Sequence, residues 1–439
     1  MNANKGPQLT SDTEINPSWG ILGAEHATSA RRVRTLEVGS AVRAFNDLAV
    51  PGMGGVWFGK QLMLATIGVH VAAAARAAGM HVHNIETANA IEALACWSAF
   101  TGPKRSEPDP RVRGGTKLRT ISKDDVSFSV FRKTSTYVTQ PMRMATVQPL
   151  RALGLVEATQ DRFSAFSCSR AGHEFLELAC APGNAQRQLI AWVKGSRQTL
   201  PADALRNALA PTEPLPEQAR EFLRERLVTG TNAAAARRAA ALAWVEHRRI
   251  SATTGAWSEQ PPMLDASHWA DLRGGAYFFL ARQAALKVLE EAERTMQKET
   301  GLPVLDLDQP IPKAVTTAIC AARACAKTFL DERHDPTGGI AKTFCTEIAD
   351  PDAAMMLGKL AVRDGRVLIL RGTRIEPGAG FAKEEAVTGD PAVEAEVDSR
   401  LRWPPGISPR VKNLFLLNLD LRGVLGEWLQ NPEVEPDRG

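Results

Sequence analysis

The densest group of residues that could do chemistry is a run of cationic side chains between positions 111 and 133. Its members are Arg111, Arg113, Lys117, Arg119, Lys123, Arg132 and Lys133, opposed mainly by Asp124 and Asp125. Cations clustered in this way can neutralise nucleic-acid phosphates, and each such contact adds about 0.9 to the salt slope of binding. A run of this kind standing alone is more typical of a solvated loop, so its role depends on the elements beside it.

A second pattern, in residues 54–61, nearly matches the phosphate-binding sequence G-x-x-x-x-G-K-[ST]. A phosphate loop needs a preceding strand, small residues and a final hydroxyl that binds magnesium. Here Gln61 replaces the hydroxyl, Trp57 and Phe58 are bulky, and the residues before the pattern favour a helix. The sequence therefore favours a turn between two helices over a nucleotide site.

Three other patterns contain metal-binding or acid–base groups. His81 and His83 could begin a metal site, and Asp306 and Asp308 could hold a divalent cation, but neither pair has a further ligand at a convincing spacing. His334 could act as an acid or a base, although no partner for it is identifiable in the sequence. The six cysteines form no C-x-x-C pair, which argues against a zinc knuckle and a disulfide scaffold. We therefore predict no metal ion and no cofactor.

The basic run is followed by a stretch, residues 136–180, that reads as helix, short strand, turn, short strand and helix. Apolar residues recur at helical spacing between positions 139 and 153. Gly154 can end this helix, because glycine adopts the left-handed conformation at little cost. Residues 155–168 then read as two short strands joined by a turn, and Ser169 can cap the final helix.

Three segments of this stretch carry a resemblance to a known family. They are Leu150-x-x-Leu153-Gly154-Leu155-Val156-Glu157, Arg162-Phe163 and Ser169-x-x-Gly172. Together they resemble the second half of bacterial winged helix-turn-helix domains. The resemblance implies that the helix before the sequence LGLVE enters the major groove of DNA and that the hairpin forms the wing. A role in protein contacts stays open, because many winged helices serve only as protein–protein modules.

The resemblance and the basic run together give a set of candidate DNA-contacting residues. They are Arg111, Arg113, Lys117, Arg119, Arg132, Lys133, Gln140, Arg143, Gln148, Arg151 and Arg162. Phosphate contacts would position the protein, and only side chains such as Arg143 or Gln148 could read base edges. Pro149 departs from the pattern, because a proline inside a helix removes a backbone hydrogen bond and costs about 3 kcal/mol. We therefore expect the helix to kink or restart there.

The chain as a whole has the composition of an ordinary globular protein, with 439 residues, 44% hydrophobic and 23% charged. A net charge of +4 is too small for a polycation, so any nucleic-acid site depends on local clustering of charge. The N-terminus has no apolar signal core, and the apolar part of residues 56–78 is too short to cross a bilayer. We therefore predict a cytoplasmic protein without membrane contact. Abundant Ala and Arg suggest a bacterial source.

We predict a mainly α-helical, multi-domain protein with an embedded winged helix and a small C-terminal α+β region. The predicted segments are a flexible arm (1–35), an N-terminal helical domain (36–108), a winged-helix domain with its basic lead-in (109–198), a helical domain (199–300) and the C-terminal α+β region (301–439). A long helix over residues 269–297 should be interrupted or bent at Gly274-Gly275. Asp364-Gly365 suits the two-residue turn of a hairpin. The leucine-rich segment 410–429 should pack against the body of the protein or against a partner surface, and we favour the body.

Three classes of function remain open on the sequence. The first is a non-enzymatic DNA-binding protein that docks a winged helix on double-stranded DNA, within a bacterial multiprotein complex. The second is a scaffold or adaptor subunit of a bacterial assembly, for example in genome defence, whose winged helix contacts proteins. The third is an enzyme acting on nucleic acid through a site too dispersed to recognise. The predicted partners are therefore DNA, other protein subunits or a second copy of the chain.

Overall fold

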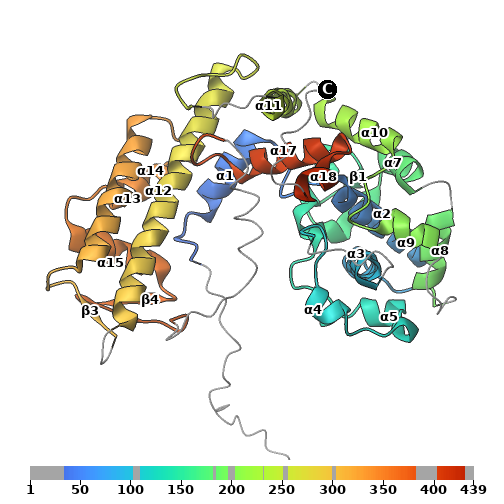
Figure 1. The fold of residues 1–439 in the computed structure, drawn as a ribbon, viewed down its shortest axis with the longest axis horizontal. Helices are drawn as coiled ribbons and strands as arrows, with labels where there is room; N and C mark the ends of the chain where they lie inside the picture. The colour runs from blue at the N-terminus through green and yellow to red at the C-terminus, as the bar shows by residue number, and fades with distance from the viewer. Residues whose placement is uncertain are drawn as a thin grey trace, which may run out of the picture.

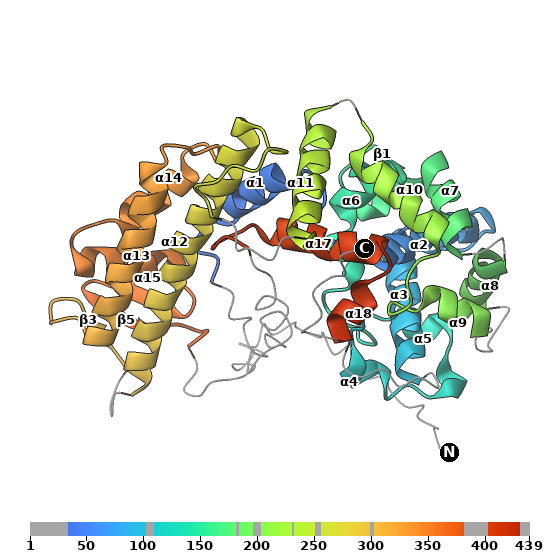
Figure 2. The same cartoon turned by 45° about the horizontal axis from the view of Figure 1, so that its top comes forward.

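A computed structural model describes residues 34–101, 109–180, 184–195, 203–230, 232–250, 256–298, 303–381 and 403–430. The protein is 63% helical and 4% strand, which confirms the predicted mainly helical fold with a small strand region. Figures 1 and 2 show two groups of helices, with α1 (Gly39–Ala49), α11 (Ala233–Ile250) and α17 (Pro409–Leu421) between them. Nearly all of the predicted flexible arm, residues 1–35, lies outside the described residues.

The first group surrounds a hairpin of two buried helices, α2 (Gly59–Ala77) and α3 (Asn84–Thr101). Both helices are apolar on most sides, as is typical of helices enclosed by protein on every side. They approach closely, since a Cβ atom on Gly68 would lie 2.5 Å from the Cβ of Ala88. Three short helices follow α3 in the chain: α4 (Gly115–Leu118), η1 (Lys123–Asp125) and α5 (Phe128–Phe131).

The stretch with the family resemblance forms an element that we call the 142–180 element. It comprises η2 (Met142–Ala145), α6 (Val147–Ala152), β1 (Val156–Ala158), η3 (Phe163–Ala165), β2 (Phe166–Cys168) and α7 (Arg170–Cys180). The two strands are antiparallel, with Glu157 opposite Ser167.

The single helix expected over residues 139–153 is wrong in its extent. A 3₁₀ turn comes first, and α6 restarts at Val147, so that Pro149 falls in the first turn of the new helix. Backbone N–H groups in a first turn have no partner within the helix, so the missing N–H of proline costs little there. Gly154 ends α6 with a φ of 67°, as the sequence indicated.

The remaining helices of the first group come from two distant parts of the chain. They are α8 (Asn184–Val193), α9 (Asp203–Leu209), α10 (Glu217–Val228), α11, α17 and α18 (Leu425–Gln430). The prediction that the leucine-rich C-terminal segment packs against the body is confirmed, because Leu414, Leu417 and Leu419 are almost fully buried. Their hydrophobic core is continuous with that of α2 and α3.

The second group is built on α12 (Ala266–Gln297) and α13 (Lys313–Asp331). Its other elements are α14 (Ile340–Ile348), α15 (Ala353–Asp364) and the strands β3 (Leu305–Asp306), β4 (Leu368–Arg371) and β5 (Arg374–Pro377). The strands form one antiparallel sheet in the order β3-β5-β4. Helix α1 completes this core, with Phe45 packed against Phe278 and Phe329.

Two local predictions for the second group are wrong. Helix α12 is not interrupted at Gly274-Gly275 but runs from Ala266 to Gln297. The glycine at 275 allows close packing, because a Cβ there would lie only 3.1 Å from the ring of Phe45. Gly365 ends α15 with a φ of 56°, and the hairpin turns instead at Gly372, between β4 and β5. The Asp364 carboxylate is occupied by Arg34, at 3.0 Å, and accepts the N–H of Leu368.

The two hydrophobic cores divide the chain between them. One draws on residues 49–276 and 403–428, and the other on residues 36–45 and 278–375. Helices α1 and α12 contribute to both cores and therefore connect them. The division into five segments stays a prediction.

Candidate nucleic-acid interface and the polar network between the cores

Helix α3 is the element that two of the predicted cations contact from separate parts of the chain. Arg132 Nη2 donates to Glu86 Oε2 at 2.6 Å, and Arg143 Nε donates to Asn89 Oδ1 at 2.5 Å. Glu86 and Asn89 are three residues apart, so they lie on the same side of the helix. The basic run and the 142–180 element therefore meet on one face of α3.

The hairpin of the 142–180 element reaches the beginning of the same helix. Asn84 Nδ2 donates to the carbonyl oxygens of Phe163 and Phe166, at 3.1 and 2.8 Å. The guanidinium of Arg143 lies 5.5 Å from the ring centroid of Phe163, within the range of a cation–π contact. Arg162, the residue before Phe163, is exposed.

Arg132 and Arg143 contact the first half of α3, and Lys133 and Arg162 each adjoin in sequence a residue that contacts it. We call them the α3 cationic surface; its members are Arg132, Lys133, Arg143 and Arg162. Lys133 and Arg162 are exposed, whereas Arg143 is partly buried and has its pKa lowered by desolvation. Arg132 and Arg143 are positioned by α3, and Lys133 and Arg162 face solvent.

A buried carboxylate fixes the start of the 142–180 element on α3. Glu92 is 1% exposed and accepts the backbone N–H groups of Met142 and Arg143 at 2.6 and 3.0 Å. Burial raises the pKa of Glu92, and these two hydrogen bonds oppose the rise. Orienting the backbone at Met142 also orients the Arg143 side chain toward Asn89.

Three further predicted cations bind other parts of the first group. Arg113 Nη1 donates to the carbonyl of Gln140 at 3.2 Å, and Lys117 Nζ donates to the carbonyl of Tyr137 at 3.0 Å. Arg119 lies over an aromatic ring near the C-terminal end of α3, 4.8 Å from its centroid. These three side chains therefore contact the 137–140 segment and the C-terminal end of α3.

Three of the predicted residues are engaged elsewhere. Arg111 is 4% exposed and forms an ion pair with Asp109 at 2.7 Å. Gln148 Oε1 accepts from Arg410 of α17 at 2.8 Å, and Arg151 pairs with Asp161 in the hairpin. We leave Arg111 out of the proposed interface because its guanidinium is enclosed.

The glycine-rich pattern lies in the turn between α1 and α2 and leads into the start of α2, so the predicted turn between two helices is confirmed. Gln61 Oε1 accepts the backbone N–H of Trp57 at 2.8 Å, and the N–H of Gly59 donates to Asp420 Oδ2 at 2.8 Å. The positive end of the α2 dipole is therefore occupied by a carboxylate of α17. Lys60 is 3% exposed, donates to a backbone carbonyl, and has its pKa lowered to about 8 by burial.

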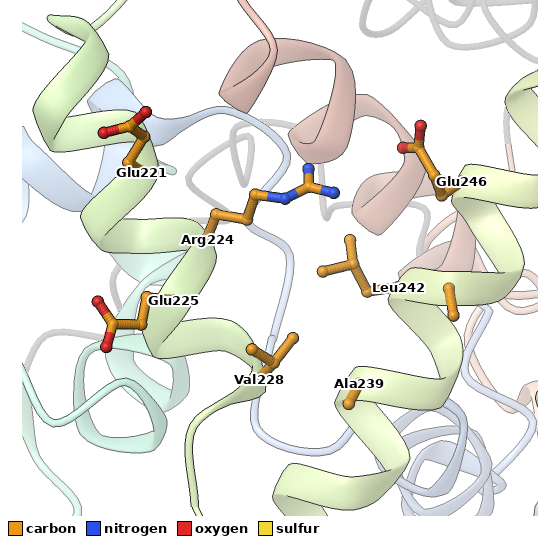
Figure 3. Close-up of a pocket in the computed structure, with 8 residues that line it drawn as sticks. Glu221, Arg224, Glu225, Val228, Ala239, Leu242 and Glu246 are labelled. Atoms are coloured by element: carbon orange, nitrogen blue, oxygen red, sulfur yellow. The ribbon is translucent and has the colours of Figure 1, made fainter.

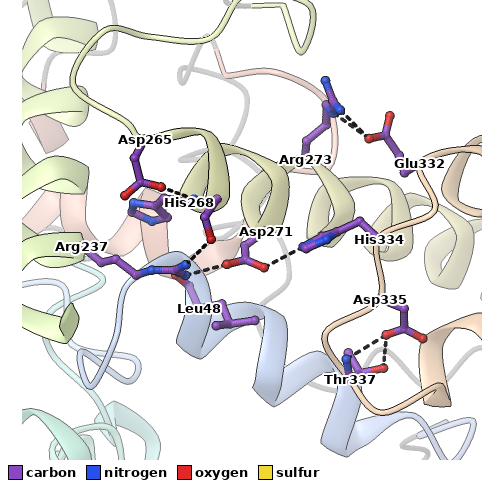
Figure 4. Close-up of polar contacts among 11 residues, drawn as sticks. Leu48, Arg237, Asp265, His268, Asp271, Arg273, Glu332, His334, Asp335 and Thr337 are labelled. Atoms are coloured by element: carbon purple, nitrogen blue, oxygen red, sulfur yellow. Dashed lines mark hydrogen bonds and ion pairs between the residues drawn. The ribbon is translucent and has the colours of Figure 1, made fainter.

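A separate polar network lies where the two cores meet (Figure 4). His334 Nε2 lies 2.8 Å from Asp271 Oδ1, and the other oxygen of Asp271 is 2.6 Å from Arg237 Nη1. Arg237 also donates to the carbonyl of Leu48 in α1, at 3.3 Å. The carboxylate partner of His334 thus comes from α12, 63 residues earlier, where no local spacing could reveal it.

Near this network, His268 is fully buried, and its Nε2 lies 2.9 Å from the carbonyl of Ala49. Burial lowers the pKa of His268. Asp265 begins α12 by accepting the N–H of His268 at 2.7 Å. The network therefore connects α1, α11, α12 and the segment around His334, and its chemistry is that of a carboxylate shared between an imidazole and a guanidinium.

Comparison with protein-family models, with curated proteins and with solved structures found no match. Among the described residues, no group of three or more His, Cys, Asp or Glu side chains could hold a metal ion. None of the described helices combines the length and the apolar character needed to span a bilayer. Asp306 accepts the N–H of Asp308 at 3.0 Å, so in this pair it caps a turn.

Proposed function

We propose that this protein binds duplex DNA through the 142–180 element, acting as a winged helix, together with the α3 cationic surface. The observation that carries the proposal is the meeting of Arg132 and Arg143 on one side of α3, where Asn84 also binds the hairpin at Phe163, the residue after Arg162. Cations gathered from separate segments create a local positive field, which the small net charge of the chain does not provide.

Each member of the surface has a part in this proposal. Lys133 and Arg162 are exposed and contact phosphates, whereas Arg132 and Arg143, which α3 already holds, set the spacing of the contacts. Phosphate contacts fix register but carry no sequence information directly. Because Gln148 is bonded to Arg410, base reading is a small part of the affinity, and we expect weak sequence preference.

Fluorescence anisotropy of a labelled duplex tests the proposal, at about 50 and 200 mM salt. The variant is Lys133→Glu/Arg162→Glu, which reverses two exposed charges. The matched control is Lys313→Glu/Lys327→Glu, which makes the same charge change on exposed positions of α13. We expect the first variant to lose affinity by about tenfold or more and its salt slope to fall by about 1 per lost contact.

The control variant should bind DNA within about twofold of the wild type, apart from a small nonspecific effect of net charge. Equal losses in the two variants would mean that only net charge matters and would overturn the assignment to this surface. No binding by the folded wild type at the lower salt concentration would overturn the DNA proposal altogether.

A second candidate is an adaptor that uses the 142–180 element for protein contacts. Two observations favour it: α6 is short, and other residues pack closely against it. A Cβ on Gly52 would lie 2.6 Å from Ala152 of α6, and a Cβ on Gly54 would lie 3.1 Å from Pro149. The loop between α1 and α2 thus lies against α6. Stable binding of a protein partner with no salt-sensitive DNA binding would select this candidate.

A further inference from the structure

Helices α10 and α11 enclose an open groove with a volume of about 480 Å³ (Figure 3). The two helices follow one another in the chain and pack at one end of the groove, with α17 behind them. A volume of this size is within the range of binding pockets, roughly 300 to 1,000 Å³. None of its lining residues belongs to the α3 cationic surface.

The interior of the groove is apolar and has room for another side chain. Val228 of α10 is 41% exposed, which places it among the few large apolar side chains of the described residues that face solvent. Leu242 forms the opposite wall, and Ala239 and Ala243 beside it are small. Since exposed apolar surface in a concave site favours binding, this strip can hold the apolar side of a partner.

Two exposed carboxylates lie on α10 beside the groove, and Figure 3 shows that of Glu225 on the side of α10 away from α11. Glu221 and Glu225, four residues apart on α10, are exposed and make no ion pair within the described part of the chain. Glu246, on α11, pairs with Arg422. The cation of the groove, Arg224, extends from α10 toward α11 and donates to Asn418 at 3.0 Å. Two carboxylates are therefore free for a cationic partner.

We propose that this groove binds a cationic amphipathic helix of a partner protein. The lining residues of α10 run from Glu221 to Val228, which at 1.5 Å per residue gives a groove of about 10 Å, or about two helical turns. Apolar anchors at i, i+3, i+4 and i+7 pack against Val228 and Leu242, as in other helix-in-groove complexes. Lysine or arginine side chains on the flank of the partner helix pair with Glu221 and Glu225.

The probe is a labelled peptide of about 14 residues, long enough to form a helix on binding, with Leu on one face and Lys on the other. A second peptide carries Glu in place of every Lys. The protein variants are Glu221→Lys/Glu225→Lys, which reverses the charge beside the groove, and Ala243→Trp, which fills the groove from an exposed position. The control is Glu174→Lys/Glu177→Lys, the same charge change on exposed positions of the neighbouring helix α7.

We expect saturable binding of the cationic peptide, with a Kd in the micromolar range, and at least about a tenfold loss in both groove variants. The α7 control should change the Kd by less than about twofold. Equal binding of the acidic peptide, equal affinity in the groove variants, or no saturable binding would each overturn the proposal. Self-association of the wild type that both groove variants abolish would assign the groove to a second copy and would also overturn it.

Discussion

Buried carboxylates in the first core and exposed helix caps in the second core bind their partners over very different distances along the chain. In the first core, Glu92 accepts two backbone N–H groups about fifty residues away, and Gly59 donates to Asp420 across 361 residues. In the second core, Asp352 accepts the N–H groups of the residues two and three places after it. The buried carboxylates of the second core, Glu293 and Asp364, resemble those of the first core, because both pair with the distant Arg34.

The two kinds of contact differ in how much of the chain must be folded before they form. A local cap forms whenever its own helix forms, whereas the partners of Glu92 and Asp420 meet only when distant segments have packed. We therefore expect substitutions of buried polar groups in the first core to have large effects, and substitutions of caps in the second core to have small ones.

The largest effect is expected for Glu92→Leu in the first core. This change leaves the N–H groups of Met142 and Arg143 buried without an acceptor, each at a cost of about 1 to 3 kcal/mol. We expect the free energy of unfolding to fall by about 3 kcal/mol or more, measured by urea denaturation. A loss below about 1 kcal/mol would show that these N–H groups find other partners and would weaken the comparison.

The next effect concerns Lys60, whose pKa is lowered from 10.5 to about 8 by burial. Between these two values the unfolded chain binds a proton that the folded chain has lost, so the stability should rise with pH. The rise should reach up to about 3 kcal/mol, since each pKa unit corresponds to about 1.4 kcal/mol.

The Lys60→Met variant isolates this contribution, because methionine keeps most of the side-chain volume without the charge. Urea denaturation at a series of pH values between 7 and 10.5 should show a rise for the wild type relative to the variant. Parallel curves for the two proteins would mean that Lys60 titrates as an exposed lysine does.

A smaller effect is expected at the junction of the cores, for Asp271→Ala. The change removes the carboxylate that bonds both His334 and Arg237, and hydrogen bonds to charged groups contribute about 1.5 to 3 kcal/mol. We expect a loss of about 2 kcal/mol and a separation of the thermal unfolding into two transitions. A single transition with unchanged midpoint would show that α1 and α12 connect the cores without this network.

The same contrast explains which features the sequence could predict. Helices α2, α3, α13 and the C-terminal leucine-rich helix follow from apolar spacing, and the interpretation of the glycine-rich pattern as a turn between two helices follows from Gln61. Partners far away in the chain could not be predicted. The pairing of Asp364 with Arg34 accompanies the wrong hairpin turn, and the packing of Phe45 on Gly275 accompanies the wrong helix interruption.

The candidate site shows the same limit. The sequence identified Arg132, Arg143 and Arg162, but the role of α3 in gathering them depends on Glu86 and Asn89, which carry no local signal. The extent of α6 could be predicted only in part, because the expected restart at Pro149 occurs two residues earlier.

The smallest effect is expected for Asp352→Ala in the second core. The carboxylate accepts the N–H groups of Ala354 and Met355 at 2.8 and 3.1 Å, and the loss of such a cap costs about 1 kcal/mol. Urea denaturation should show this loss, with no change in the binding of DNA. A loss as large as that of Glu92→Leu would remove the distinction between the two cores.

Site-specific photo-crosslinking shows whether duplex DNA lies on the α3 cationic surface, as we propose. A benzophenone-bearing amino acid is placed at Lys133, at Arg162 or, as the control, at Lys327 on α13, all exposed positions. We predict crosslinks to duplex DNA from the first two positions and none from the third. Crosslinks from Lys327 alone, or equal yields at all three positions, would contradict the account.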